Sequence, residues 1–238
     1  MDILTLLESY LDNTYYTEDE EAFQIELLPG LSEEELQALQ NRMPNQWLPE
    51  AIKALLKFCR GIDFLPMEEV KFDEYEQNAY QGLFPHAITL DGDGFGNYWV
   101  VDIDFQGEWK SVYYICHDPP VVVKQAENLK EFISQLHALG KNPETSIINE
   151  VHDANSMKIW DHRDAFKDQK EVPASVEVDL TRLPKNYFIA NLIDQPVKSG
   201  FPLIISREDI NVIRPTDSAL WVVELQESKG WLKRLFGK

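Results

Sequence analysis

The chain has 238 residues, 44% apolar and 26% charged, which suits one large domain or two small ones with a buried core. No apolar run approaches the roughly 18 residues that a membrane-spanning helix needs. The acidic N-terminal segment also lacks the positive charge of an export signal. Cys59 and Cys116 have the spacing of neither a zinc site nor a redox motif. We therefore expect buried thiols in a reducing cytoplasm, with a disulfide as the alternative.

The net charge of −19 is unevenly distributed along the chain. Residues 1–145 hold 27 Asp/Glu against 9 Lys/Arg, whereas residues 146–238 hold 14 against 13. The first part therefore repels nucleic acid and anionic membranes, and it attracts a basic partner. Acidity that serves only solubility would produce the same composition.

The first part of the sequence predicts three helices. Apolar residues at helical spacing indicate a short amphipathic helix over 3–11. Ser32 and Glu35 form a capping-box pattern, which opens a second helix that should end near Arg42. Pro49 fits the first turn of a third helix, which Gly61 can end.

From about residue 87 the apolar pattern changes to the two-residue period of strands, before a further helix over 126–140. The predicted strands cover 87–90, 97–105 and 110–117. One face of the middle strand, which should meet the core, carries Trp99, Val101, Ile103 and Phe105. Asp102 and Asp104 lie on the opposite face and should point away from the core.

Residues 146–238 predict a β-rich region that is either a separate small domain or an extension of the first sheet. Prolines separate its short strand-like runs, which cover 174–180, 186–193, 201–206, 211–213 and 219–225. The last ten residues, 229–238, are basic and amphipathic. We expect a terminal helix there that packs on its own domain.

The stretch Asp91–Asp104 concentrates four carboxylates, three glycines and an asparagine. It matches an EF-hand calcium loop only in part, because Phe95 offers no ligand oxygen and a strand follows instead of a helix. It also fails as a dinucleotide loop, since no helix N-terminus follows and the acids would repel phosphate. We interpret it as a turn that presents Asp91 and Asp93 at the rim of a sheet.

The sequence shows no specific catalytic motif, although carboxylate catalysis is harder to exclude. Paired carboxylates can hydrolyse glycosides, but close pairs arise by chance among 41 acids. No G-x-S-x-G motif is present, and a lone histidine such as His117 is typical of a turn. We therefore expect no catalytic residue, metal site or cofactor, with a metal- or carboxylate-dependent enzyme as an alternative.

The order of features over about residues 30–140 resembles the SUKH superfamily, named partly for a fungal regulator of glucan synthesis. The resemblance rests on a helix opened by Leu-Pro, a Gly-Asn turn entering a strand, a second glycine turn and a strand ending in His-Asp. These motif positions are Leu48, Pro49, Gly61, Gly96, Asn97, Gly107, His117 and Asp118. The chain departs from the pattern at Arg60-Gly61, where the family commonly has Asn-Gly.

The resemblance implies an α+β fold, with a mixed or antiparallel sheet and helices packed against it. It also implies a non-enzymatic binding protein, because bacterial members of the superfamily are immunity proteins that block a toxin domain, often a nuclease. A basic toxin would meet an acidic surface with apolar anchors. Our candidates for that surface are Asp73, Glu74, Tyr75, Glu76, Asp91, Asp93, Phe95, Asp102, Asp104, Glu108 and Trp109. The alternative is a regulatory scaffold in cell-wall or glucan synthesis, with the basic tail as a docking segment.

Overall fold

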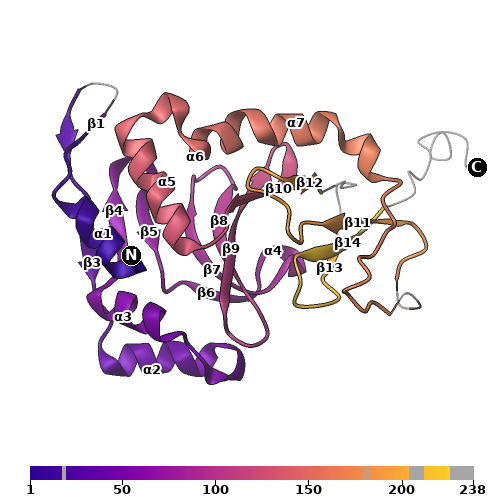
Figure 1. Ribbon diagram of the computed structural model, residues 1–238, viewed down its shortest axis with the longest axis horizontal. Helices are drawn as coiled ribbons and strands as arrows, with labels where there is room; N and C mark the ends of the chain where they lie inside the picture. The colour runs from indigo at the N-terminus through magenta and orange to yellow at the C-terminus, as the bar shows by residue number, and fades with distance from the viewer. Residues whose placement is uncertain (18–19, 180, 182, 204–211, 226–238) are drawn as a thin grey trace, which may run out of the picture.

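The computed structural model describes residues 1–17, 20–179, 181, 183–203 and 212–225. The fold is α+β, as predicted, and every strand pairing in the described residues is antiparallel. Figure 1 places the N-terminal helices on one side of a central sheet and the C-terminal strands on the other. No helix in these ranges is long and apolar enough to cross a membrane.

The central sheet has six strands in the order β12-β10-β9-β8-β7-β6. Their bounds are β6 Tyr75–Asn78, β7 Phe84–Gly92, β8 Tyr98–Ile103, β9 Trp109–His117, β10 Pro120–Ala126 and β12 Gly200–Pro202. The strands β7 to β10 form a meander of successive neighbours, as short polar turns between apolar runs dictate. The sequence predicted β7, β8 and β9 but missed β10, whose run of valines has no alternating pattern.

The first face of this sheet is covered by helices and by a three-stranded sheet in the order β3-β4-β5. These elements are α1 Ile3–Leu11, α2 Glu33–Arg42, α3 Glu50–Phe58, α5 Leu129–Lys141, β3 Glu26–Pro29, β4 Cys59–Phe64 and β5 Glu68–Lys71. The predicted capping box of α2 is confirmed, since Ser32 and Glu35 bond each other's backbone N–H groups. Cys59 and Cys116 are buried free thiols, and burial raises the pKa of Cys59 to about 11.

The second face of the central sheet is covered by the C-terminal region. A three-stranded sheet in the order β11-β14-β13 packs there, together with the single turn α4. The bounds are α4 Ala79–Gly82, β11 Tyr187–Asn191, β13 Val212–Ile213 and β14 Leu220–Glu224. Trp221 of β14 is fully buried against Phe84, Tyr113 and Phe201, and its indole N–H donates to the Leu83 carbonyl at 2.7 Å.

Two sequence predictions about β8 are wrong because the sheet is covered on both faces. Asp102 does not point away into solvent: it is 2% exposed and lies beneath the C-terminal region. Val100 on the same face is fully buried. Phe105, which was placed on the core face, follows the end of β8 and is 43% exposed.

Residues 146–238 contain more helix than the strand-like runs indicated. The short helices α6 Ile147–Asn149 and α7 Ser156–Asp161 are joined by a π-helical turn over Glu150–Asn155. Residues 174–179 form no strand, so the prediction for this run is wrong over its described part. The strand β12 extends the central sheet by pairing with β10. The tail 229–238 lies outside the described residues.

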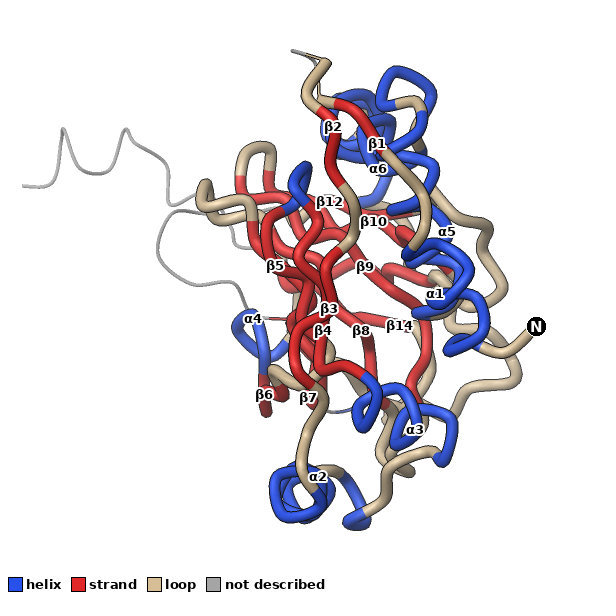
Figure 2. The backbone as a smooth tube through the Cα atoms, turned by 90° about the vertical axis from the view of Figure 1, so that its left-hand side faces the viewer, coloured by secondary structure: helices blue, strands red, loops and turns tan. Residues whose placement is uncertain are grey.

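The remaining elements are short. A two-stranded hairpin joins β1 Tyr15–Tyr16 to β2 Ala22–Phe23, and Figure 2 shows it at the same end of the molecule as α6. The single-turn helices cover Pro44–Gln46, Leu65–Met67, Pro143–Thr145 and Arg163–Phe166.

Candidate functional site

The predicted rim turn is a tightly hydrogen-bonded hairpin between β7 and β8. Gly94 and Gly96 adopt φ values of 72° and 90°, a left-handed conformation that disfavours other residues. The Asp93 carboxylate accepts from the backbone N–H of Phe95 at 2.9 Å and of Asn97 at 3.2 Å. Its second oxygen accepts from the Asn97 side-chain amide. One aspartate therefore fixes the whole turn.

Asn97 connects this turn to the neighbouring strand. Its side chain is 8% exposed, and its carbonyl oxygen accepts from the backbone N–H of His117 at 2.7 Å. A Cβ atom built on Gly96 would lie 3.4 Å from the His117 side chain. The turn is thus fastened to the end of β9, which restricts its motion.

Phe95 sits at the tip of this fastened turn and is 83% exposed, more than any other large apolar side chain in the described residues. Its backbone N–H is held by Asp93, so little main-chain freedom remains to be lost when a partner binds. A rigidly displayed aromatic side chain is the typical anchor of a protein–protein interface.

Two carboxylates beside Phe95 have opposite pKa shifts. Burial raises the pKa of Asp91 to about 7, and the charges of Glu68 and Asp93 add to that rise. Burial acts on Asp93 in the same direction, but the hydrogen bonds from Asn97 and Phe95 outweigh it and lower the pKa. Asp93 is therefore a fixed negative charge at neutral pH, whereas Asp91 titrates near neutrality.

A histidine from the π-helical turn faces this hairpin. His152 Nε2 lies 3.7 Å from Asp93 Oδ2, and His152 Nδ1 lies 2.7 Å from Asp153 Oδ1. Its ring also packs against the buried ring of Tyr114, with 5.6 Å between centroids. Sequence reasoning missed His152, because its segment lies more than fifty residues beyond the hairpin and carries no motif of its own.

The other predicted surface residues fall into two further groups. Along the sheet edge, Glu74 and Glu76 are exposed, Asp73 is half-buried, and burial raises the Asp73 pKa. Tyr75 is 5% exposed and its hydroxyl bonds His86 at 2.7 Å, so it is no surface anchor. The edge strand thus offers acids without an apolar centre.

The third group lies at the opposite end of β8 from Phe95, about 17 Å away for six residues of strand. Asp102 is buried in an ion pair with Arg214 and is removed from the candidate surface. Asp104 is 7% exposed, accepts from the backbone N–H of Gln106 and Glu108, and pairs with Lys110. It shapes the turn between β8 and β9 instead of facing a partner.

Glu108 at this end is exposed but accepts from the Trp47 indole N–H at 3.1 Å, while Trp109 is half-buried against the first core. The eleven predicted residues therefore do not form one surface. Only Asp91, Asp93 and Phe95 combine charge, an apolar anchor and a fixed geometry.

Comparison with known proteins places the hairpin within a recognised family segment. The model of the SMI1 / KNR4 family (SUKH-1) matches residues 30–135. This segment, somewhat under half of the chain, is similar to the SUKH-1 family. Searches of curated proteins and of solved structures found no match. The SUKH resemblance predicted from the sequence is confirmed, and it covers the central meander with its hairpin.

Most other SUKH-1 motif positions hold the fold together. Leu48 is fully buried, and Pro49 precedes the first turn of α3. A Cβ atom on Gly61 would lie 2.5 Å from the Val70 carbonyl oxygen. Gly107 has a φ of 92°, with Trp47 and Pro44 close against it. His117 and Asp118 are both exposed beside the hairpin, where the Gly96-Asn97 motif meets the His-Asp motif.

A cavity of about 430 Å³ opens beside the SUKH-1 hairpin and includes Asp93 and His152 in its lining. Residues from the β1–β2 hairpin, the turn Leu65–Met67 and the segment 139–149 complete its wall. Sequence reasoning missed this cavity because its walls come from segments that are distant along the chain. No local pattern brings them together.

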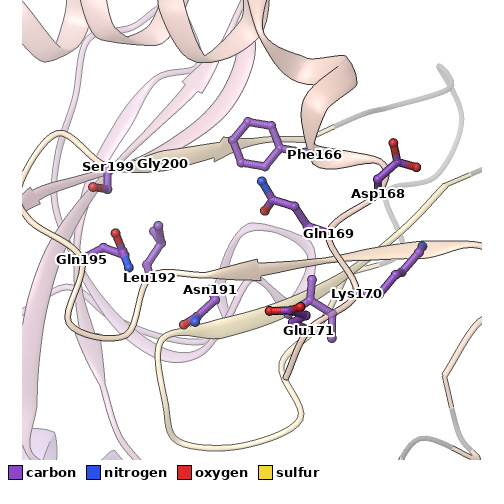
Figure 3. Close-up of a pocket in the computed structure, with 11 residues that line it drawn as sticks. Phe166, Asp168, Gln169, Lys170, Glu171, Asn191, Leu192, Gln195, Ser199 and Gly200 are labelled. Atoms are coloured by element: carbon purple, nitrogen blue, oxygen red, sulfur yellow. The ribbon is translucent and has the colours of Figure 1, made fainter. Parts of the chain in front are cut away.

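A second cavity of about 560 Å³ lies outside the SUKH-1 segment, between β11, β12 and the loop after residue 166 (Figure 3). Its lining is mainly polar, with Gln169, Asn191 and Gln195 among its residues. Across the part of the chain that the structure describes, no group of three His, Cys, Asp or Glu side chains is arranged to hold a metal.

Proposed function

We propose that this protein is a non-enzymatic immunity protein that acts in the cytoplasm and neutralises a basic toxin domain, such as a nuclease. The SUKH-1 match supports a protein of the immunity or regulatory kind at a coarse level, and this superfamily is associated with protein partners such as toxins. Three parts of the proposal go beyond that match: that the partner is a toxin, that it is basic, and that the protein acts in the cytoplasm.

The observation that carries the proposal is the exposed Phe95 on a turn that Asp93 and Asn97 hold rigid. An aromatic side chain at 83% exposure offers a partner an apolar anchor to bury. The backbone at Phe95 is held in place, so burial of its side chain in a partner's pocket needs little further ordering of the main chain. Asp93 and Asp118 beside it add negative charge to the contact.

Charge complementarity supports a basic partner. The segment 1–145 holds 27 acids against 9 basic residues, and its field would accelerate the encounter with a cationic protein. A nuclease domain binds polyanions through a cationic groove, and an acidic surface can occupy such a groove. The complex should therefore form faster and bind more tightly at low ionic strength.

The test is capture by tagged full-length protein from lysate and secreted fraction of the source organism, at about 0.05 M and 0.5 M salt. Captured proteins are identified by mass spectrometry. We expect one basic protein with a toxin domain, and at least a tenfold loss of binding in Phe95→Ala. Met157→Ala, which removes another exposed apolar side chain on α7, is the control.

Capture that is unchanged in Phe95→Ala would contradict the proposal at this surface. Recovery of wall-synthesis proteins, or of several partners that bind independently of salt, would instead favour the regulatory scaffold. The basic tail that the scaffold hypothesis would use lies outside the described residues.

A further inference from the structure

The 430 Å³ cavity beside the hairpin has an apolar floor. Trp99, Leu139 and Ile148 line it, and each of these side chains is less than 5% exposed. Most of its wall residues are apolar, and among them Asp93 is the single carboxylate and His152 the single histidine. A cavity of this size accepts an aromatic or large aliphatic side chain, whose burial is worth about 1.5–3 kcal/mol.

Apolar side chains also surround the mouth of the cavity. Tyr16 is 61% exposed and Leu65 is 54% exposed, and both belong to the wall. They come from different segments, the β1–β2 hairpin and the turn before β5, which the fold brings together at the cavity wall. Two exposed apolar groups that converge on one cavity form a continuous patch.

Exposed acids lie close in sequence to wall residues in four of the segments that form this cavity. Glu21 lies beyond Thr17, Glu68 beyond Met67, Glu144 beyond Pro143 and Asp153 beyond His152, and all four acids are exposed. Asp93 adds a fifth carboxylate from the hairpin. The segments that form the wall therefore carry five carboxylates, which together are named the acidic ring of the cavity.

Two lysines that follow wall residues in sequence, Lys71 and Lys141, are held by other groups. Lys71 pairs with Glu69 and Glu74 at 3.5 and 2.9 Å. Lys141 donates to the Thr14 carbonyl at 3.0 Å and lies over the Tyr15 ring. A ligand with positive charge would therefore meet carboxylates that these two lysines do not pair with.

We propose that this cavity is the socket for one large apolar side chain that is flanked by Lys or Arg residues on a partner protein. The inference rests on the proposed function and deepens it, since it names the partner segment that the cavity lined by Asp93 accepts. A partner with an apolar residue and acidic flanks would be repelled by the ring. A neutral apolar ligand would gain nothing from it.

The inference is tested on the full-length protein with three synthetic peptides. The first is acetyl-Lys-Lys-Phe-Lys-Lys-amide, the second replaces its Phe by Ala, and the third replaces its lysines by glutamates. Binding is followed by the methyl resonances of Leu65, Met67 and Ile148, which report on the cavity itself. We expect shifts with the first peptide, at least tenfold weaker binding of the second, and none with the third.

A matched pair of variants distinguishes peptide binding at the cavity from non-specific attraction to the overall negative charge of the chain. Leu65→Lys places a cation on the rim at an exposed position and should weaken the first peptide by about tenfold or more. Met157→Lys adds the same charge at another exposed apolar position that lies outside the cavity wall, and it should change binding less than twofold.

Each outcome decides the inference. Equal shifts from the Phe peptides with Lys and Glu flanks would overturn the cationic requirement, and the absence of any shift would overturn the socket. Concentration-dependent shifts without peptide would show that a second copy of the chain fills it, which also overturns the inference. If the peptides do not bind but Phe95→Ala still loses the captured partner, the socket is refuted and the proposed function stands.

Discussion

Asp102 on β8 and Arg214 beyond β13 form a bidentate ion pair that crosses from the SUKH-1 segment to the C-terminal region. The two side chains are 2% and 3% exposed, and one of the two contacts measures 2.7 Å. Arg214 also donates to the Asp217 and Ser218 carbonyls and lies over the Trp221 ring. Desolvation raises the pKa of Asp102, and the guanidinium opposes that rise.

Removal of one partner of this pair should destabilise the protein strongly. Arg214→Met leaves a buried carboxylate without its counter-charge, and we expect a loss of about 3–5 kcal/mol in the free energy of unfolding. The double variant Asp102→Leu with Arg214→Met should recover most of that loss. Urea denaturation of the two single variants and the double variant measures the coupling. Additive losses in the double variant would show that the pair does not act as a unit.

A surface pair serves as the comparison for that experiment. Lys53 and Glu50 are 2.7 Å apart, but the Glu50 side chain is 79% exposed. Glu50→Gln should change the free energy of unfolding by less than about 1 kcal/mol, because water screens exposed pairs.

Asp91 should make stability fall as the pH rises toward neutrality. Its pKa in the folded protein is about 7, above the ordinary carboxyl value of about 4, so the folded state binds the proton more tightly than the unfolded state. The favourable contribution is complete below pH 4 and is lost by about pH 7. Glu68 and Asp93 raise this pKa, while Lys71 and the Gly92 N–H oppose the rise.

The substitution Asp91→Asn isolates this effect, since an amide oxygen can still accept from the Gly92 N–H. We expect a gain of about 1–3 kcal/mol at pH 8, after allowance for partial exposure of the carboxylate, and no gain at pH 4. Thermal or urea denaturation across that range checks it. A gain that is equal at both pH values would refute the assignment.

Gly107 and Gly94 should respond differently to the same substitution. Both have left-handed φ values, 92° and 72°, so alanine strains the backbone at either position. A Cβ on Gly107 would lie 2.9 Å from the Trp47 ring, whereas a Cβ on Gly94 would meet nothing within 4 Å. Gly94→Ala should cost about 1 kcal/mol and Gly107→Ala clearly more. The order of their melting temperatures decides the matter.

Asn97→Ala should loosen the hairpin without changing its exposed surface. The substitution leaves the His117 N–H without its acceptor and removes one donor to Asp93. We expect a loss of about 1–3 kcal/mol in stability and faster amide exchange at Phe95. Phe95→Ala should leave stability within about 0.5 kcal/mol, because that side chain is exposed. If the Phe95 amide exchanges no faster in Asn97→Ala, this asparagine does not hold the turn.

The features that sequence reasoning predicted correctly are local ones. The α2 capping box needs only residues within one turn of each other, and the Gly-Asn turn of the hairpin follows from the conformations of adjacent residues. The family resemblance rested on the same kind of short-range pattern and covers residues 30–135 in the comparison.

The failures concern contacts that are distant along the chain. Alternation in β8 was interpreted with one buried face, so Asp102 was placed in solvent. Its partner Arg214 lies 112 residues away along the chain, and no local sequence pattern predicts this pairing. Proximity in sequence also suggested a single acidic surface, but the strand β8 separates Asp93 from Asp104. The cavity that Asp93 lines was missed for the same reason, since several remote segments build it.

Because β14 lies near the C-terminal end of the chain, the central sheet is synthesised well before the strand that completes the cover of its second face. The central meander ends at Ala126, but its second face is not fully covered until Trp221 has been made almost a hundred residues later. At about 5–20 residues per second, ribosomes leave part of that apolar face exposed for roughly 5–20 s. The acids in residues 1–145 give neighbouring nascent copies the same charge, which should keep these faces apart until synthesis is complete.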